Sequence, residues 1–176
     1  MRDHFEDLYF SEDAIYMESN SRSFVRRAHT TNINTEAVCD MLRSPQNAHL
    51  IKEVYYPKWQ TRTNYDACRL REPLVPEWPT GFGGLFSVTF HSKEASHAFF
   101  DALPCSKGPS LGTNFTLACP YTILAHYFEL DWAAQYGVEA DLVRVSIGLE
   151  PVEKLFEFFK VALAAAEAAV RETAST

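Results

Sequence analysis

Basic residues are scarce in this sequence relative to acidic ones. There are 16 lysines and arginines against 23 aspartates and glutamates, which gives a formal net charge of −7. Arg26 and Arg27 form an isolated pair rather than part of a basic stripe. Proteins that bind nucleic acids neutralise phosphates with clustered Lys and Arg side chains. The composition therefore excludes nucleic acid as an expected partner.

Long hydrophobic runs and cysteine pairs are also missing. No apolar stretch reaches the roughly 20 residues that span a bilayer, and the acidic start of the sequence has no hydrophobic segment of the secretory type. The four cysteines show no Cys-x-x-Cys spacing, which favours reduced thiols. We therefore expect a cytoplasmic protein without a membrane partner, with free thiols at Cys39, Cys68, Cys105 and Cys119.

The remaining composition is typical of a folded domain. Hydrophobic residues make up 47% of the 176 positions and aromatic residues 14%, enough to form a substantial core. Apolar side chains recur at helical spacing from Ser11 to Ser44. The polar segment 29–35 is predicted to bend or divide this helix, with Thr35 as an N-cap. Pro45, directly after Ser44, is predicted to end it.

Further along the chain, strand patterns alternate with helical ones. Strands are predicted at 49–57, 85–90 and 141–150. Two segments rich in proline, glycine and hydroxyl residues, 71–84 and 108–121, are predicted to be loops. The helices, with Ser92 as one N-cap and Pro151 at another first turn, are predicted at 63–70, 92–103, part of 121–137, and 151–172. This order predicts a mixed α/β domain of the α+β type, with helices packed on a small sheet.

Two glycine-containing stretches lack the motifs that bind phosphates. Segment 108–121, GPSLGTNFTLACPY, has no lysine after Gly112 and does not match a Walker A loop. Segment 81–84, GFGG, leads into a strand instead of joining a strand to a helix, so it predicts a turn and not a dinucleotide site. No catalytic triad can be assembled from the sequence.

A metal site is the less favoured interpretation of the segment HYFELD. His126, Glu129 and Asp131 could face one another at helical spacing and hold a metal. No second cluster of ligand residues supports this. A half-buried His126 with a hydrogen-bond partner is the favoured interpretation, and no metal is expected.

Arg144 is the most informative charged residue. It lies in DLVRVSIG, a predicted strand whose other residues are mostly apolar. A buried or half-buried arginine needs an ion-pair partner or an anionic ligand, and its planar fork donates two parallel hydrogen bonds to a carboxylate. Three interpretations stay open: a carboxylate-binding residue, a structural ion pair, and an arginine on the solvent face of the strand.

Three stretches are more specific than any of these features. They are SEDAIYMESNSRSF with NTEAVCDMLRS, then GPSLGTNFTL, then DLVRVSIGLEPVEKL. In this order they resemble the C-terminal portion of the cystathionine γ-synthase family, above all its fungal branch. The resemblance implies a helical lead-in and linker helix at 1–44. It also implies a C-terminal α/β substrate-side domain at 45–176, with an antiparallel-rich sheet covered by helices, as in fold-type I pyridoxal-phosphate enzymes.

The resemblance also implies a function. Members of the family use pyridoxal 5′-phosphate in cysteine and methionine metabolism, with small amino acids as substrates. Arg144 would bind the α-carboxylate of the substrate, and Ser110, Leu111 and Gly112 would line the substrate pocket. A homo-oligomer or a full-length family member is an implied partner. Thr113 and Phe115 depart from the family pattern after SLG, so the resemblance implies no particular substrate.

The cofactor lysine of the family is absent from this chain. The family places it in a Ser-x-Thr-Lys context, which none of the six lysines has. Two hypotheses follow. The chain is the substrate-binding portion of a cystathionine γ-synthase or γ-lyase type of enzyme, without activity on its own. Alternatively, it is a non-catalytic binding or assembly partner of a full-length relative.

Overall fold

The structure of the protein is a computed structural model that describes residue 6 and residues 8–174. The strands are β1 (Ile51–Tyr55), β2 (Leu85–Phe90), β3 (Ser106–Lys107), β4 (Leu117–Pro120) and β5 (Val143–Ser146). The α-helices are α1 (Ser11–Ser21), α2 (Phe24–Leu42), α3 (Arg62–Cys68), α4 (Lys93–Ala102), α5 (Tyr121–His126), α6 (Leu130–Gln135) and α7 (Val152–Ala174). Two short 3₁₀ turns are η2 (Pro45–Asn47) and η3 (Tyr127–Glu129).

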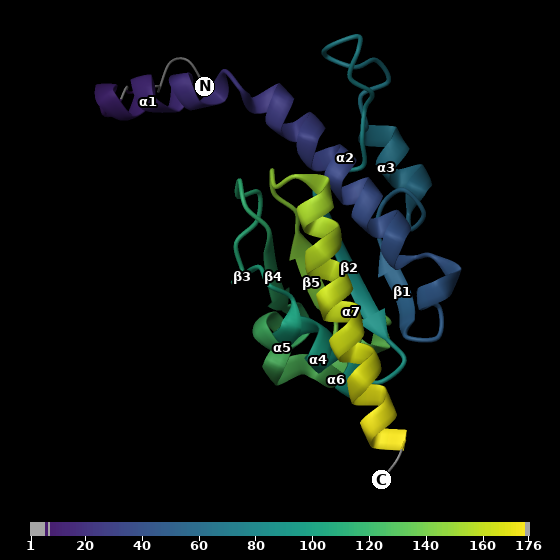
Figure 1. The fold of residues 1–176 in the computed structure, drawn as a ribbon. Helices are drawn as coiled ribbons and strands as arrows, with labels where there is room; N and C mark the ends of the chain where they lie inside the picture. Colours follow the sequence, from purple (N-terminus) through teal and green to yellow (C-terminus); the bar gives the residue numbers. More distant parts are fainter. Residues whose placement is uncertain (1–5, 7, 175–176) are drawn as a thin grey trace.

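The strands form one sheet in the order β1-β2-β5-β4-β3, antiparallel except for the β3–β4 pair. Strand side chains alternate between the two faces. One face packs against helices α2, α4 and α7, and the long α7 lies in front of the strands in Figure 1. The core on this face includes Phe86 and Val88 from β2, Val145 from β5, and Phe99 and Phe159 from the helices. The predicted fold class, an antiparallel-rich sheet covered by helices, is confirmed.

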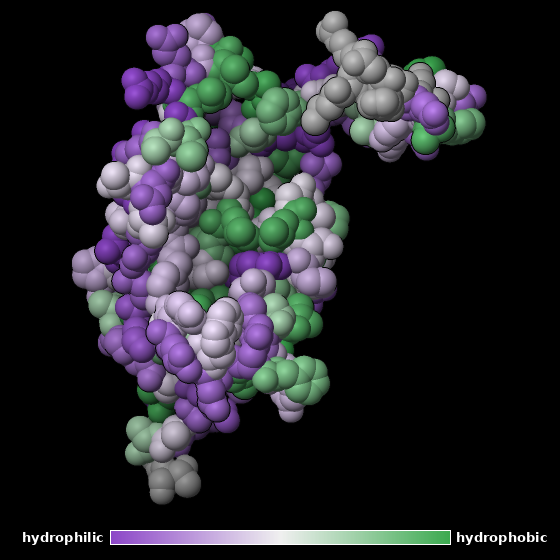
Figure 2. Space-filling view, turned by 180° about the vertical axis from the view of Figure 1, so that it is seen from behind, coloured by the Kyte–Doolittle hydropathy of each residue, from purple (hydrophilic) through white to green (hydrophobic). Residues whose placement is uncertain are grey.

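The opposite sheet face carries the polar residues of the strands. Arg144 of β5 pairs in register with Ser87 of β2 and Cys119 of β4. Ser146, two residues on, points to the same face because strand side chains have a period of two. Figure 2 shows the molecule from behind, on the side away from α7, where hydrophobic and hydrophilic areas alternate around a hollow. The candidate site lies at the end of this face, where Leu85 and Ser146 line a cleft together with α2.

The predicted division of the first long helix was misplaced. The break lies at Arg22 and Ser23, and segment 29–35 continues through the middle of α2. Thr35 is an interior residue, so its predicted role as an N-cap was wrong; its hydroxyl donates to the carbonyl of Thr31 at 2.6 Å. Asn34 donates to the carbonyls of Gly148 and Glu150. Tertiary partners of this kind keep polar residues inside a helix despite their preference for caps.

The second half of segment 108–121 was also predicted wrongly. Residues 117–120 are not a loop but form β4, which pairs with β5. Strand β2 covers the predicted strand 85–90, whereas β1 and β5 are shorter than the strands predicted at 49–57 and 141–150. Ser92 caps α4 by accepting a hydrogen bond from the Ala95 amide at 3.1 Å. All four cysteines are free thiols.

Helix α1 extends away from the rest of the molecule (Figure 1). None of its residues is buried, and Ile15 is 70% exposed. In contrast, α2 contributes Val38, Cys39 and Leu42 to the core. The boundary near residue 44 between a helical lead-in and a C-terminal domain stays a prediction. Within the described residues, no helix has the combination of length and apolar character needed to cross a membrane.

Candidate functional site

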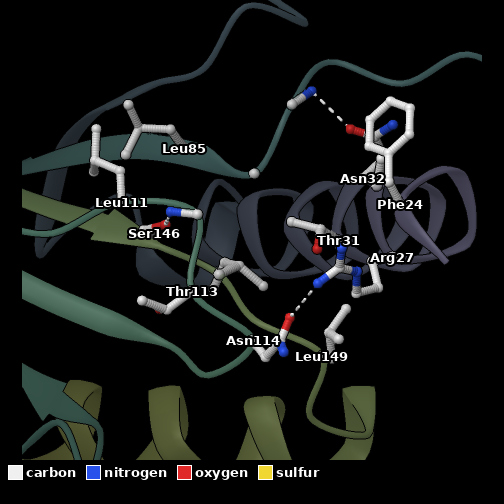
Figure 3. Close-up of a pocket in the computed structure, with 15 residues that line it drawn as sticks. Phe24, Arg27, Thr31, Asn32, Leu85, Leu111, Thr113, Asn114, Ser146 and Leu149 are labelled. Carbon is white, nitrogen blue, oxygen red and sulfur yellow. Dashed lines mark hydrogen bonds between the residues drawn. The ribbon is translucent and has the colours of Figure 1, made fainter. Parts of the chain in front are cut away.

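A cleft of about 440 Å³ lies between α2, the start of β2, the loop 111–114 and the end of β5. Its size falls within the range of pockets for small organic molecules. Figure 3 shows its walls, with Arg27 and Asn32 from α2 on one side and Leu111 and Ser146 on the other. The cleft therefore joins segments that are up to about 120 residues apart in the sequence, which only the folded chain brings together.

Two hydrogen bonds fix the loops that line the cleft. The amide of Gly83 donates to Oδ1 of Asn32 at 2.9 Å. The amide of Gly112 donates to Oγ of Ser146 at 3.1 Å, and both bonds are drawn in Figure 3. A Cβ on the neighbouring Gly84 would collide with the methyl group of Thr31. The GFGG segment is therefore an irregular approach to β2 that needs glycine because α2 lies so close.

A partly buried hydrogen-bond network holds the loop that lines the cleft. The carboxylate of Glu150 accepts from the amide of Thr116 at 2.6 Å and from its hydroxyl at 2.9 Å. The same hydroxyl accepts from the amide of Gly148 at 3.1 Å. Asn34 holds the carbonyls of Gly148 and Glu150 from α2. Loop 113–116 is thereby tied to both β5 and α2.

Arg144 lies beside the cleft and is half-buried. Its Nη2 donates to the carbonyl of Pro109 at 2.6 Å, and its guanidinium stacks over the ring of Tyr121 at 4.7 Å. Burial raises the pKa of the neighbouring Cys119 thiol, and Arg144 opposes this shift. No carboxylate forms an ion pair with Arg144 among the described residues, which removes the structural ion pair from the open interpretations.

The other predicted site residues, Ser110, Leu111 and Gly112, lie in the loop that follows Pro109, whose carbonyl accepts a hydrogen bond from Arg144. Leu111 and Gly112 line the cleft, whereas Ser110 is exposed and is not among the lining residues. The Pro109 carbonyl connects this loop to Arg144. The structure thus places all four predicted residues in one region, but Arg144 and Ser110 lie outside the cleft itself. Their roles toward a substrate stay predictions.

Sequence reasoning missed several residues that build the cleft. Ser146 could have been found, because it lies two residues after Arg144 on the same face of a strand. The part of the cleft wall that comes from α2 could also have been predicted to lie together. Its residues, such as Arg27 and Thr31, are three or four positions apart, a spacing that places them on one face of a helix. Asn114 carries no local signal, because only folding brings it to α2.

The prediction that His126 is half-buried and has a hydrogen-bond partner is confirmed. Its Nδ1 lies 2.7 Å from Oε1 of Glu129, and the ring is half-buried. Asp131 is not part of this pair. Among the residues that the structure describes, no group of three or more His, Cys, Asp or Glu side chains is placed to hold a metal ion.

The structure is a small α/β domain with a cleft of small-molecule size, and comparisons identify its family. Residues 13–164 match the Cys/Met metabolism PLP-dependent enzyme family, and the chain belongs to this family. It is 52% identical over 177 residues to a cystathionine gamma-synthase-like enzyme of Amanita muscaria, covering 94% of the chain and 28% of the relative. Against the cystathionine gamma-synthase of Neurospora crassa the identity is 50% over 163 residues, covering 92% and 25%.

Solved structures show the same fold. Cystathionine gamma synthase from Xanthomonas oryzae pv. oryzae, in complex with cystathionine, superimposes with a TM-score of 0.68 at 24% identity, covering 84% of this chain and 36% of that one. Cystathionine gamma-lyase from yeast gives a TM-score of 0.66 at 24% identity, covering 82% and 36%. The chain thus spans between a quarter and three-tenths of the length of the curated relatives above.

The residues present do not complete a site for pyridoxal phosphate, the cofactor named in the family description. No lysine lines the cleft. Lys58 is paired with Glu36 and Asp40, and Lys52 with Glu139. Lys107 donates to the carbonyls of Phe100 and Leu103, and burial lowers its pKa. Lys93, Lys154 and Lys160 are on the outer surface of helices α4 and α7.

We expect this chain alone to form no specific Schiff base with pyridoxal phosphate, because no lysine lies at the cleft. Incubation with the cofactor, borohydride reduction and peptide mass spectrometry should show sparse labelling spread over exposed lysines such as Lys93 and Lys160. An unrelated folded protein with exposed lysines, treated in parallel, sets the background of unspecific labelling. Stoichiometric labelling of one lysine would contradict this prediction.

Proposed function

We propose that this chain forms the substrate-carboxylate side of a pyridoxal-phosphate enzyme of cystathionine γ-synthase or γ-lyase type. Such an enzyme joins an activated homoserine to cysteine or cleaves cystathionine in sulfur amino-acid metabolism. Family membership and identities of about one half to cystathionine gamma-synthases support this proposal. The cofactor lysine and phosphate site would come from residues that this chain does not contain.

The observation that carries the proposal is the environment of Arg144. A half-buried guanidinium without a carboxylate partner is costly unless a ligand completes its hydrogen bonds. The Pro109 carbonyl and the Tyr121 ring hold the group in place and leave donors for an incoming carboxylate. Arg144 would bind the α-carboxylate of the amino acid, and Ser110, Leu111 and Gly112 would form the adjoining wall.

Replacing Arg144 with alanine tests the assignment. Loss of a buried, charge-assisted contact to a carboxylate costs at least about 2 kcal/mol, so the affinity for L-cystathionine should fall roughly 30-fold or more. Calorimetric titration of the chain measures this directly. Arg62→Ala, which removes an exposed arginine paired with Asp66, is the matched control and should bind as the wild type does. Equal affinities of all three proteins would rule out Arg144 as the carboxylate site.

The exposed surface of helix α1 supports a second candidate function. This chain would then be a non-catalytic binding or assembly partner of a full-length relative. The helix has no buried residue, and with Leu8, Tyr9 and Phe10 it presents exposed apolar side chains that a partner could cover. The labelling experiment bears on this candidate as well, since a self-sufficient cofactor lysine would exclude it.

A further inference from the structure

We propose that the cleft has its own carboxylate subsite, formed by the guanidinium of Arg27. Arg27 is the one formally charged residue among those that line the cleft in the described structure. No carboxylate of the described residues forms an ion pair with it. An anion that enters the cleft therefore meets one cation and no repelling acid. This inference does not depend on Arg144, which is not a lining residue.

The hydrogen bonds of Arg27 are incomplete. Its Nη2 donates to the carbonyl of Asn20 at 2.9 Å, and its Nη1 reaches Oδ1 of Asn114 only at 3.5 Å. Its Nε is buried and has no partner among the described residues. A guanidinium has five N–H donors, so three of them have no partner among the described residues. An anion with two oxygens would replace the long bond to Asn114, which faces Arg27 across the cleft in Figure 3, with stronger charge-assisted bonds.

The lining favours a small organic carboxylate over a phosphate. Phosphate sites gather several free backbone amides or cations around one group. Here the amides of Gly83 and Gly112 are already bonded to Asn32 and Ser146. Apolar side chains also line the cleft, alongside the hydroxyls of threonine and serine residues, and they suit a short hydrocarbon body. These apolar residues are Phe24, Leu85, Leu111, Ile147 and Leu149.

The side-chain Nε–H signal of Arg27 in a ¹⁵N-labelled chain tests the proposal. The signal is assigned by its loss in Arg27→Lys. Titration with succinate should shift the signal saturably, whereas the uncharged analogue succinamide should leave it unchanged. Absence of a shift at high succinate concentration would overturn the proposal.

Matched variants and a second probe sharpen the test. Arg27→Ala should weaken succinate binding at least about tenfold. Arg26→Ala, which removes an exposed charge from the neighbouring position, should change it less than about twofold. Far-UV circular dichroism checks that α2 is intact in both.

If inorganic phosphate binds as tightly as succinate, the assignment of the ligand as a carboxylate is wrong. If Arg144→Ala but not Arg27→Ala weakens succinate binding, the subsite is at Arg144 and this inference fails while the proposed function stands.

Discussion

Replacing Phe99 with alanine is expected to lower the free energy of unfolding by about 4 kcal/mol. Phe99 of α4 is fully buried, and its ring centroid lies 4.9 Å from that of Phe90 and 6.1 Å from that of Phe159. Truncation removes a large apolar surface from the core and leaves a cavity between the sheet and two helices. The neighbouring rings belong to separate elements and cannot all move in to fill it.

Equilibrium unfolding in urea measures the effect of Phe99→Ala as a lower midpoint with an unchanged slope. Phe128→Ala is the matched control, because Phe128 is 98% exposed and loses little contact on truncation. Its free energy of unfolding should stay within about 0.5 kcal/mol of the wild type. A loss for Phe99→Ala as small as that of the control would show that the core is not centred on this residue.

Elements with strong local signals were predictable from the sequence. The strand at β2 has apolar residues in alternation, α4 begins at a capping serine, and α7 follows a proline with a continuous apolar stripe. In each case the local preference agrees with the tertiary environment. These elements give the fold class without any knowledge of long-range contacts.

Elements that depend on long-range contacts were not predictable. Strand β4 follows a stretch of glycine, proline and hydroxyl residues, and it is a strand because Ala118 and its neighbours pair with β5. Segment 29–35 reads as a helix break, yet Asn32 and Asn34 find partners near residues 83 and 148. The cleft was not predictable for the same reason, because the residues around Arg27 come from loops far along the chain. In the sequence Arg27 is one half of an isolated basic pair, and nothing there indicates that it is the one charged residue of the cleft wall in the described part of the chain.

Replacing Gly148 with alanine is expected to lower the free energy of unfolding by about 3 kcal/mol. A Cβ at this position would lie 2.5 Å from the backbone of Phe115 and 2.6 Å from Oε2 of Glu150. The obstructing atoms belong mainly to a backbone, which cannot rotate away as a side chain can. Loop 113–116 must therefore shift, and the hydrogen bonds among Glu150, Thr116 and Gly148 must lengthen.

The same displacement would disturb the cleft, because Asn114 lies in the loop that has to move. Urea unfolding should give the stability loss, and the Nε–H signal of Arg27 should shift in Gly148→Ala without any ligand. Gly108→Ala is the matched control: its Cβ would meet only a side-chain carbon of Leu117, at 3.8 Å. That variant should stay within about 0.5 kcal/mol of the wild type and keep the Arg27 signal. If Gly148→Ala loses stability but leaves the Arg27 signal in place, the network at Gly148 supports the fold without positioning the cleft wall. If Gly148→Ala is as stable as Gly108→Ala, the close approach of loop 113–116 to Gly148 is wrong.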